Sequence, residues 1–96
     1  MAREVVWTSP AWDDLEAAAE YIARDSMYYA AAFVREVKEA SESLSEMAER
    51  GQIVPEFRDP SIRELLVRPY RLVYRVGGEQ VIILAVIHGA RRAWRT

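Results

Sequence analysis

The residues best suited to chemistry are arginines in the stretch PYRLVYRVGGEQVIILAVIHGARRAW, residues 69–94. Arg71 and Arg75 alternate with apolar residues, as expected for the outward side of a half-buried strand. Arg91 and Arg92 follow the next apolar run. A guanidinium keeps its charge and presents a planar fork of donors that suits phosphate or carboxylate. The pattern is consistent with an anion-binding surface and equally with an ordinary solvated sheet face.

Cleavage of RNA through its 2′-hydroxyl would need a proton acceptor and a proton donor beside these arginines. Arginine serves poorly in either role because it hardly ever releases its proton. Histidine is the side chain that ordinarily titrates near neutral pH, and His88 is the only one in the chain. We therefore take Arg71 and Arg91 as candidate phosphate-stabilising residues and His88 as a weak acid–base candidate, with a structural role for His88 as the competing interpretation. Glu64 is a second candidate base, although an ion pair with a neighbouring arginine explains it better.

Composition excludes several other functions. The chain has no cysteine, so it has neither disulfides nor thiolate metal sites. It contains no P-loop, dinucleotide fingerprint or HExxH motif, and we expect no cofactor and no metal site. The charge is unevenly distributed: residues 1–50 hold eleven acidic and five basic residues, and residues 51–96 hold four acidic residues and eight arginines. The two halves therefore carry −6 and +4, which gives the net charge of −2.

The hydrophobic pattern predicts one α+β domain over residues 1–96. A strand is expected first, then two helices in an antiparallel hairpin, then three strands. Ser9 is the expected N-cap of the first helix, Asp25 or Ser26 that of the second, and Gly51 is expected to end the second helix in a left-handed conformation. The predicted elements cover residues 4–8, 9–22, 26–50, 62–67, 70–76 and 81–88.

The last strand is apolar on both faces, which predicts a position in the middle of the sheet. With four strands numbered in chain order, the expected sheet is twisted, mostly antiparallel and ordered 2-3-4-1. The helix hairpin packs on one face, and the opposite face, from which Arg71 and Arg75 point, is expected to be exposed. The longest apolar run, residues 81–87, is too short to cross a membrane, and no signal peptide is visible. A cytoplasmic protein without a membrane partner is therefore expected.

Three segments, taken in order, resemble toxins of the RelE/ParE superfamily from bacterial type II toxin–antitoxin modules. They are YIARDSMYYAAAFV, IRELLVRPYRLVYRV and VIILAVIHGARR, at residues 21–34, 62–76 and 81–92. The resemblance extends from about Val5 to Arg92. It implies a growth-inhibiting toxin, of the kind that also stabilises plasmids. It further implies a cognate antitoxin whose C-terminal segment wraps the toxin in a hetero-oligomer.

The resemblance implies one of two activities. RelE-like members are metal-independent ribonucleases that cut mRNA in the ribosomal A site, whereas ParE-like members bind DNA gyrase. The RelE pattern of basic residues falls on Arg71 and Arg91, and approximately on Arg63. The tyrosine that RelE-like enzymes carry in a C-terminal extension has no counterpart here, where the only aromatic residue is Trp94. The candidate binding residues are Arg63, Arg75, Arg92 and Trp94.

The missing tyrosine favours ParE-like inhibition of gyrase over nuclease activity. A RelE-like mRNA endonuclease is the alternative, and an inactive member that serves as an antitoxin-binding or co-repressor module is a third hypothesis. Whether the chain is an enzyme is left open. The expected antitoxin is acidic or amphipathic, because it must cover the arginine-rich half, and its C-terminal segment folds on binding.

Overall fold

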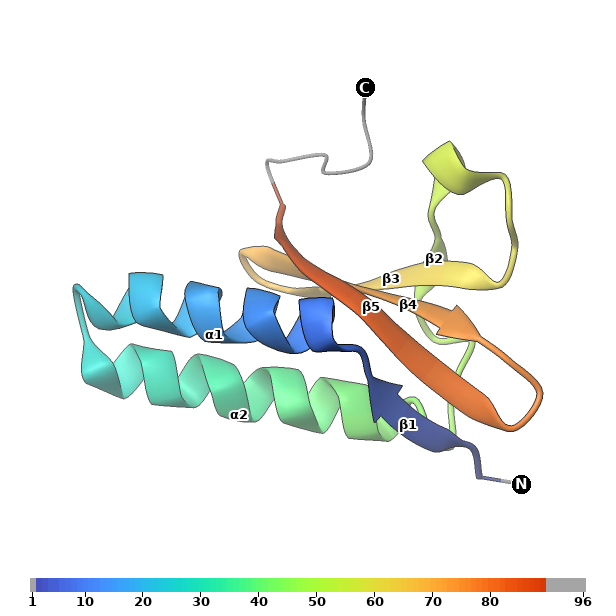
Figure 1. The fold of residues 1–96 in the computed structure, drawn as a ribbon, viewed down its shortest axis with the longest axis horizontal. Coiled ribbons are helices and arrows are strands. Elements are labelled where there is room, and N and C mark those ends of the chain that lie inside the picture. Colours follow the sequence, from blue (N-terminus) through green and yellow to red (C-terminus); the bar gives the residue numbers. More distant parts are fainter. Residues whose placement is uncertain (1, 90–96) are drawn as a thin grey trace.

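The computed structural model describes residues 2–89 and consists of a helix hairpin packed on a five-stranded mixed sheet (Figure 1). The sheet order is β1-β5-β4-β3-β2, with β1 parallel to β5 and the other pairs antiparallel. The elements are β1 (Glu4–Trp7), α1 (Ser9–Ala23), α2 (Met27–Ser43), β2 (Gln52–Ile53), η1 (Pro55–Phe57), β3 (Ile62–Val67), β4 (Tyr70–Val76) and β5 (Gln80–His88).

The predicted fold class and the order of the four predicted strands are confirmed, but the strand count was wrong by one. The additional strand, β2, lies in the segment that the sequence indicated as a loop, and it pairs with β3 at the sheet edge. Two residues are too few to show a period of two. Within residues 2–89, no helix is long and apolar enough to cross a membrane.

The helix boundaries differ from prediction at three of their four ends. Thr8, not Ser9, caps α1 by accepting a hydrogen bond from the Ala11 amide at 3.2 Å. Ser26 caps α2 as predicted and accepts from the Tyr29 amide at 3.1 Å. The first helix runs one residue past the predicted end, and α2 ends at Ser43, well before the predicted stop.

Gly51 is required for a close approach and not for a left-handed helix end. Its φ is not positive. A Cβ atom placed there would lie 2.5 Å from the Tyr74 hydroxyl oxygen and 2.6 Å from the Glu64 carbonyl oxygen. The segment that follows α2 therefore passes so close to β3 and β4 that a side chain at this position would collide with the sheet.

The main core lies between the hairpin and the sheet. Tyr74 is fully buried there, and its hydroxyl accepts a hydrogen bond from the Gly51 amide at 3.0 Å and donates one to the Ala48 carbonyl at 2.9 Å. This side chain ties the end of the helical layer to β4. The same core cluster includes the buried side chains of Leu15, Phe33, Val37, Leu44, Tyr70, Leu72, Val81 and Ile83.

The opposite face of the sheet is partly covered, which corrects the expectation that it would be exposed. Val54, in the segment after β2, packs there with Ile62, Val73 and Ile87 in a second buried cluster. A bulge also changes which side chains of β5 lie on each face. Val73 pairs with Ala85 while Tyr74 pairs with Ile83, so Leu84 is the extra residue in β5. The bulge shifts the alternation of β5, and the two predicted faces exchange side chains beyond it.

Candidate functional site

Arg71 lies on the sheet face opposite the helices and is committed to an ion pair. Its Nη1 atom donates to the Glu64 carboxylate at 2.7 Å across β3 and β4, and only 13% and 15% of the two side chains are exposed. The expectation that Arg71 projects freely into solvent was therefore wrong. The interpretation of Glu64 as an ion-pair partner is confirmed. A carboxylate in this position already neutralises the cation that a phosphate would need.

Arg75 lies on the same face, four residues further along β4, and is exposed as predicted. Its charge acts on Asp59, which belongs to the turn before β3. The Ser61 hydroxyl and amide donate to the Asp59 carboxylate at 2.7 and 3.0 Å and lower its pKa, and the Arg75 charge lowers the pKa further. This end of the face therefore presents a solvated arginine beside an ionised aspartate.

Arg63 lies on the helix-facing side, because it pairs with Tyr74 in the register of β3 and β4. Its Nη1 atom donates to the Gly51 carbonyl at 2.8 Å and to the Glu49 carbonyl at 3.3 Å. Both carbonyls belong to the segment that leaves α2. This geometry gives Arg63 a structural function in holding that segment against the sheet.

His88 lies on the other side of the sheet from Arg71. It pairs with Tyr70 across β4 and β5, and the two rings meet edge to face with their centroids 5.3 Å apart. Tyr70 in turn packs against Phe33 of α2 at 5.0 Å. Because neighbouring residues of a strand point to opposite faces, Tyr70 and Arg71 diverge. The structure therefore does not bring the candidate acid–base group and the candidate phosphate-binding arginine together.

The remaining candidates, Arg91, Arg92 and Trp94, lie outside the described residues. In the described part of the chain, no group of three or more His, Cys, Asp or Glu side chains is arranged to hold a metal ion. The candidate residues that can be placed thus divide into two structural arginines, one exposed arginine and one histidine that packs against Tyr70 of β4.

Sequence reasoning missed three polar or aromatic features near the helix hairpin. Alternation puts Tyr74 on the core side of its strand but does not reveal that its hydroxyl bonds to Gly51 and Ala48. Asp14 of α1 accepts a hydrogen bond from the Val86 amide at 3.0 Å, beyond the point where β1 stops pairing with β5 at Ile83. Trp7 and Trp12 form an edge-to-face pair with centroids 5.7 Å apart. The two tryptophans belong to a strand and a helix, so no single period in the sequence could link them.

Comparison with known proteins agrees with this fold. The chain matches the family model described as the ParE toxin of type II toxin-antitoxin system, parDE, over residues 5–93. It is 37% identical over 89 residues to Toxin RelE2 of Caulobacter vibrioides, with 92% of this chain and 97% of that protein covered.

Two solved structures share the fold. The chromosomal ParDE toxin–antitoxin system from P. aeruginosa has a TM-score of 0.73 at 28% identity, with 91% of this chain and 96% of that chain covered. The RelBE2 toxin–antitoxin complex from Mycobacterium tuberculosis has a TM-score of 0.62 at 26% identity, with 92% and 99% covered. The resemblance to RelE/ParE toxins is confirmed. The chain belongs to the ParE toxin family and is the toxin of a type II toxin–antitoxin system.

Proposed function

We propose that this toxin acts in the cytoplasm by binding DNA gyrase, without cutting RNA, and that a cognate antitoxin neutralises it. The observation that carries the proposal is the Arg71–Glu64 ion pair on the sheet face opposite His88. A ribonuclease needs cationic donors and a proton-transfer group around one phosphate. Arg71 is held by a carboxylate and His88 lies on the other face, so this pair does not form such a centre.

The match to the ParE family model supports the same choice of target. Arg75 remains exposed on the sheet face opposite the helices and is available for a protein interface. Interfaces use arginine often, and they do not need it beside a proton-transfer group. A binding mechanism is therefore compatible with each described position of the candidate residues.

The antitoxin partner is supported by the two similar structures, which are named as ParDE and RelBE2 toxin–antitoxin assemblies. The charge asymmetry of this chain adds a physical argument, because residues 51–96 carry +4 and attract an acidic segment. We expect the antitoxin to cover the arginine-rich half with a segment that folds when it binds. Co-expression with the product of the neighbouring reading frame tests this directly, through co-purification and relief of growth arrest.

A RelE-like nuclease is the second candidate. It is favoured by the 37% identity to a protein named Toxin RelE2 and by the similarity to the RelBE2 complex. The two candidates differ in what a purified toxin does to purified targets. Gyrase supercoiling of a relaxed plasmid and ribosome-dependent cleavage of a defined mRNA should be measured with one preparation, with and without the antitoxin.

We expect inhibited supercoiling and intact mRNA, with supercoiling restored when the antitoxin is added first. Cleaved mRNA with normal supercoiling would overturn the gyrase proposal in favour of the nuclease. No effect in either assay, from a folded preparation that still binds its antitoxin, would indicate an inactive binding or co-repressor module. Pulse labelling in an induced bacterial host gives an independent readout, because gyrase inhibition stops DNA synthesis before protein synthesis.

A further inference from the structure

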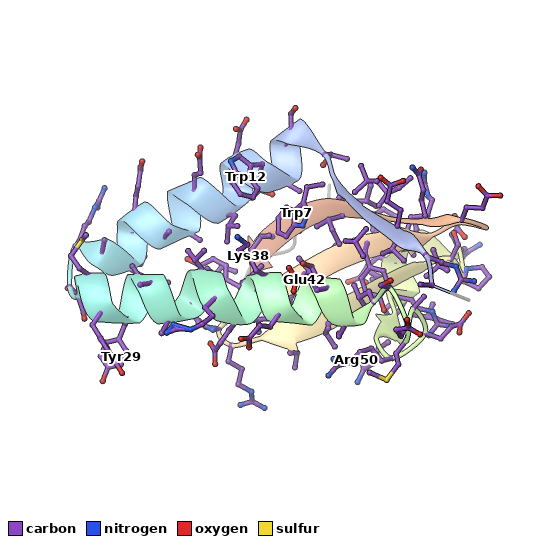
Figure 2. The ribbon with its side chains drawn as sticks, turned by 90° about the horizontal axis from the view of Figure 1, so that it is seen from below. Trp7, Trp12, Tyr29, Lys38, Glu42 and Arg50 are labelled. Carbon is purple, nitrogen blue, oxygen red and sulfur yellow. The ribbon has the colours of Figure 1, made fainter. Side chains whose placement is uncertain are left out.

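A hollow of about 290 Å³ lies where β1 passes into α1. It is lined by Trp7, Thr8, Ser9, Trp12 and Asp13. The two indoles meet at an interplanar angle of 87°, and 44% of Trp12 remains exposed. Figure 2 shows both tryptophans on the side of the molecule where Lys38 and Glu42 project from α2. This hollow differs in chemistry from the arginine-bearing sheet face, because its walls are aromatic and its charged side chain is acidic.

The polar groups of the hollow favour a cation. The Thr8 hydroxyl is already used, since it donates to the Ile83 carbonyl at 2.8 Å and caps α1. Asp13 is exposed at the rim and forms neither an ion pair nor a hydrogen bond with any residue in the described range 2–89. An indole face attracts cations more strongly than any other aromatic side chain. The hollow therefore combines an aromatic wall with a carboxylate that has no partner among residues 2–89.

Acidic side chains outnumber basic ones near the hollow, where Figure 2 shows Lys38 and Glu42 on the same side as the tryptophans. Asp13, Asp14 and Glu16 lie within four positions near the start of α1, and residues 1–50 carry −6 in total. The positive end of the helix dipole opposes a cation here, but its influence falls off within the first turn of α1, and Asp13 lies beyond that turn. Asp14 is engaged by the Val86 amide, so Asp13 is the acid left to pair with a ligand.

We infer that this hollow binds an arginine side chain of the antitoxin, with the guanidinium on the indole of Trp12 and its N–H groups toward Asp13. The inference rests on the proposed antitoxin partner. Arginine fits better than lysine because its planar, weakly hydrated head stacks on an aromatic ring while donating to a carboxylate. The occupant complements the acidic half of the toxin, whereas an acidic segment complements the arginine-rich half. The antitoxin therefore carries charges of both signs, each directed to a different region.

The chemistry of the hollow can be tested without the antitoxin. The probe is N-acetyl-arginine amide, and its neutral isostere N-acetyl-citrulline amide is the control. The readout is the indole N–H resonances of Trp7 and Trp12 in a titration of the full chain. We expect saturable millimolar shifts with the arginine probe only, and an affinity about threefold weaker in Asp13→Asn, as for an exposed ion pair. Glu20→Gln, which removes an exposed acid of α1 outside the hollow, should leave the affinity unchanged.

The complex provides the second arm. Each basic residue of the antitoxin is neutralised in turn, and the dissociation constant is measured against wild type and Asp13→Asn. We expect one antitoxin arginine whose effect is coupled to Asp13, with about a threefold or larger non-additive change in affinity. Equal shifts with arginine and citrulline probes, no saturable shift, or additivity at every basic residue would each overturn the inference while leaving an antitoxin that binds. An antitoxin that fails to bind wild type would instead refute the proposed partner, and the probe titration would still decide the chemistry of the hollow.

Discussion

Breaking the Arg71–Glu64 ion pair should destabilise the fold, although single arginines on a sheet face ordinarily contribute little. Both side chains are about six-sevenths buried, and their charged atoms are 2.7 Å apart. Exposed pairs contribute at most about 1 kcal/mol, whereas removing one partner of a buried pair costs roughly 3–5 kcal/mol. This pair lies between these limits, so we expect Arg71→Ala to lower the free energy of unfolding by about 2 kcal/mol. Glu64→Gln should cost about 1 kcal/mol, because the amide oxygen still accepts a hydrogen bond.

The assay is urea unfolding followed by far-UV circular dichroism, with the double variant Arg71→Met/Glu64→Leu as the third arm. Replacing both charges by apolar side chains of similar size leaves no buried charge, so the double variant should be close to wild type in stability. The same three proteins should then enter the supercoiling and mRNA-cleavage assays. A gyrase binder that does not use Arg71 keeps its activity in the stable double variant, whereas a nuclease that uses Arg71 loses it.

Two results would refute this reasoning. Single variants that both stay within about 0.5 kcal/mol of wild type would mean that the ion pair is effectively solvated. A further double variant that combines the same two changes, Arg71→Ala and Glu64→Gln, and is as unstable as their sum would mean that the two side chains do not interact.

Other stability predictions concern the contact between Tyr74 and the segment after α2. Tyr74→Phe leaves the buried Gly51 amide and Ala48 carbonyl unpaired and should cost about 3 kcal/mol, whereas Tyr28→Phe, on an exposed ring, should be neutral by thermal unfolding. Burial raises the pKa of Tyr74 above the ordinary tyrosine value. The stability that its protonated hydroxyl contributes is therefore present below the ordinary tyrosine pKa and is lost as the pH rises through the raised pKa. Tyr74→Phe should flatten the alkaline part of the curve of unfolding free energy against pH. Gly51→Ala should cost about 2 kcal/mol through collision with the Glu64 carbonyl, whereas Gly78→Ala, which meets nothing within 4 Å, should not; an equal loss in both would contradict the steric argument.

Much of the fold could be predicted because its long elements carry clear periodic patterns. The apolar run of β5 indicates an interior strand, and the spacing of Phe33 and Val37 indicates the buried side of α2. The end of α2 could not be predicted in the same way, because Leu44 and Ala48 continue the apolar spacing into the turns that follow the helix. The bulge at Leu84 has no composition signal, since every residue around it is apolar.

The candidate site was less predictable than the fold. Alternation correctly placed Arg71 and Arg75 on one face, but it could not indicate that Arg71 would be mostly buried in an ion pair with Glu64 while Arg75 stays in solvent. Alternation along β5 places His88 on the same face as Val86, and contacts between distant segments make that face the helical one at that end of the sheet. Side-chain burial depends on contacts between distant segments, which a local pattern does not contain.

The parallel pairing of β1 with β5 determines when, during synthesis, the sheet of the toxin can be completed. Val5 pairs with Val81, so the first strand to be synthesised can pair only after the last strand of the described chain has been made (Figure 1). Until β5 leaves the ribosome, β1 and β4 have no strand between them, and the N-terminal strand has no partner in the sheet. Polypeptides released early by premature termination or by damaged messenger therefore lack the continuous sheet. A fragment that ends before β5 therefore cannot join β1 to β4 in one sheet.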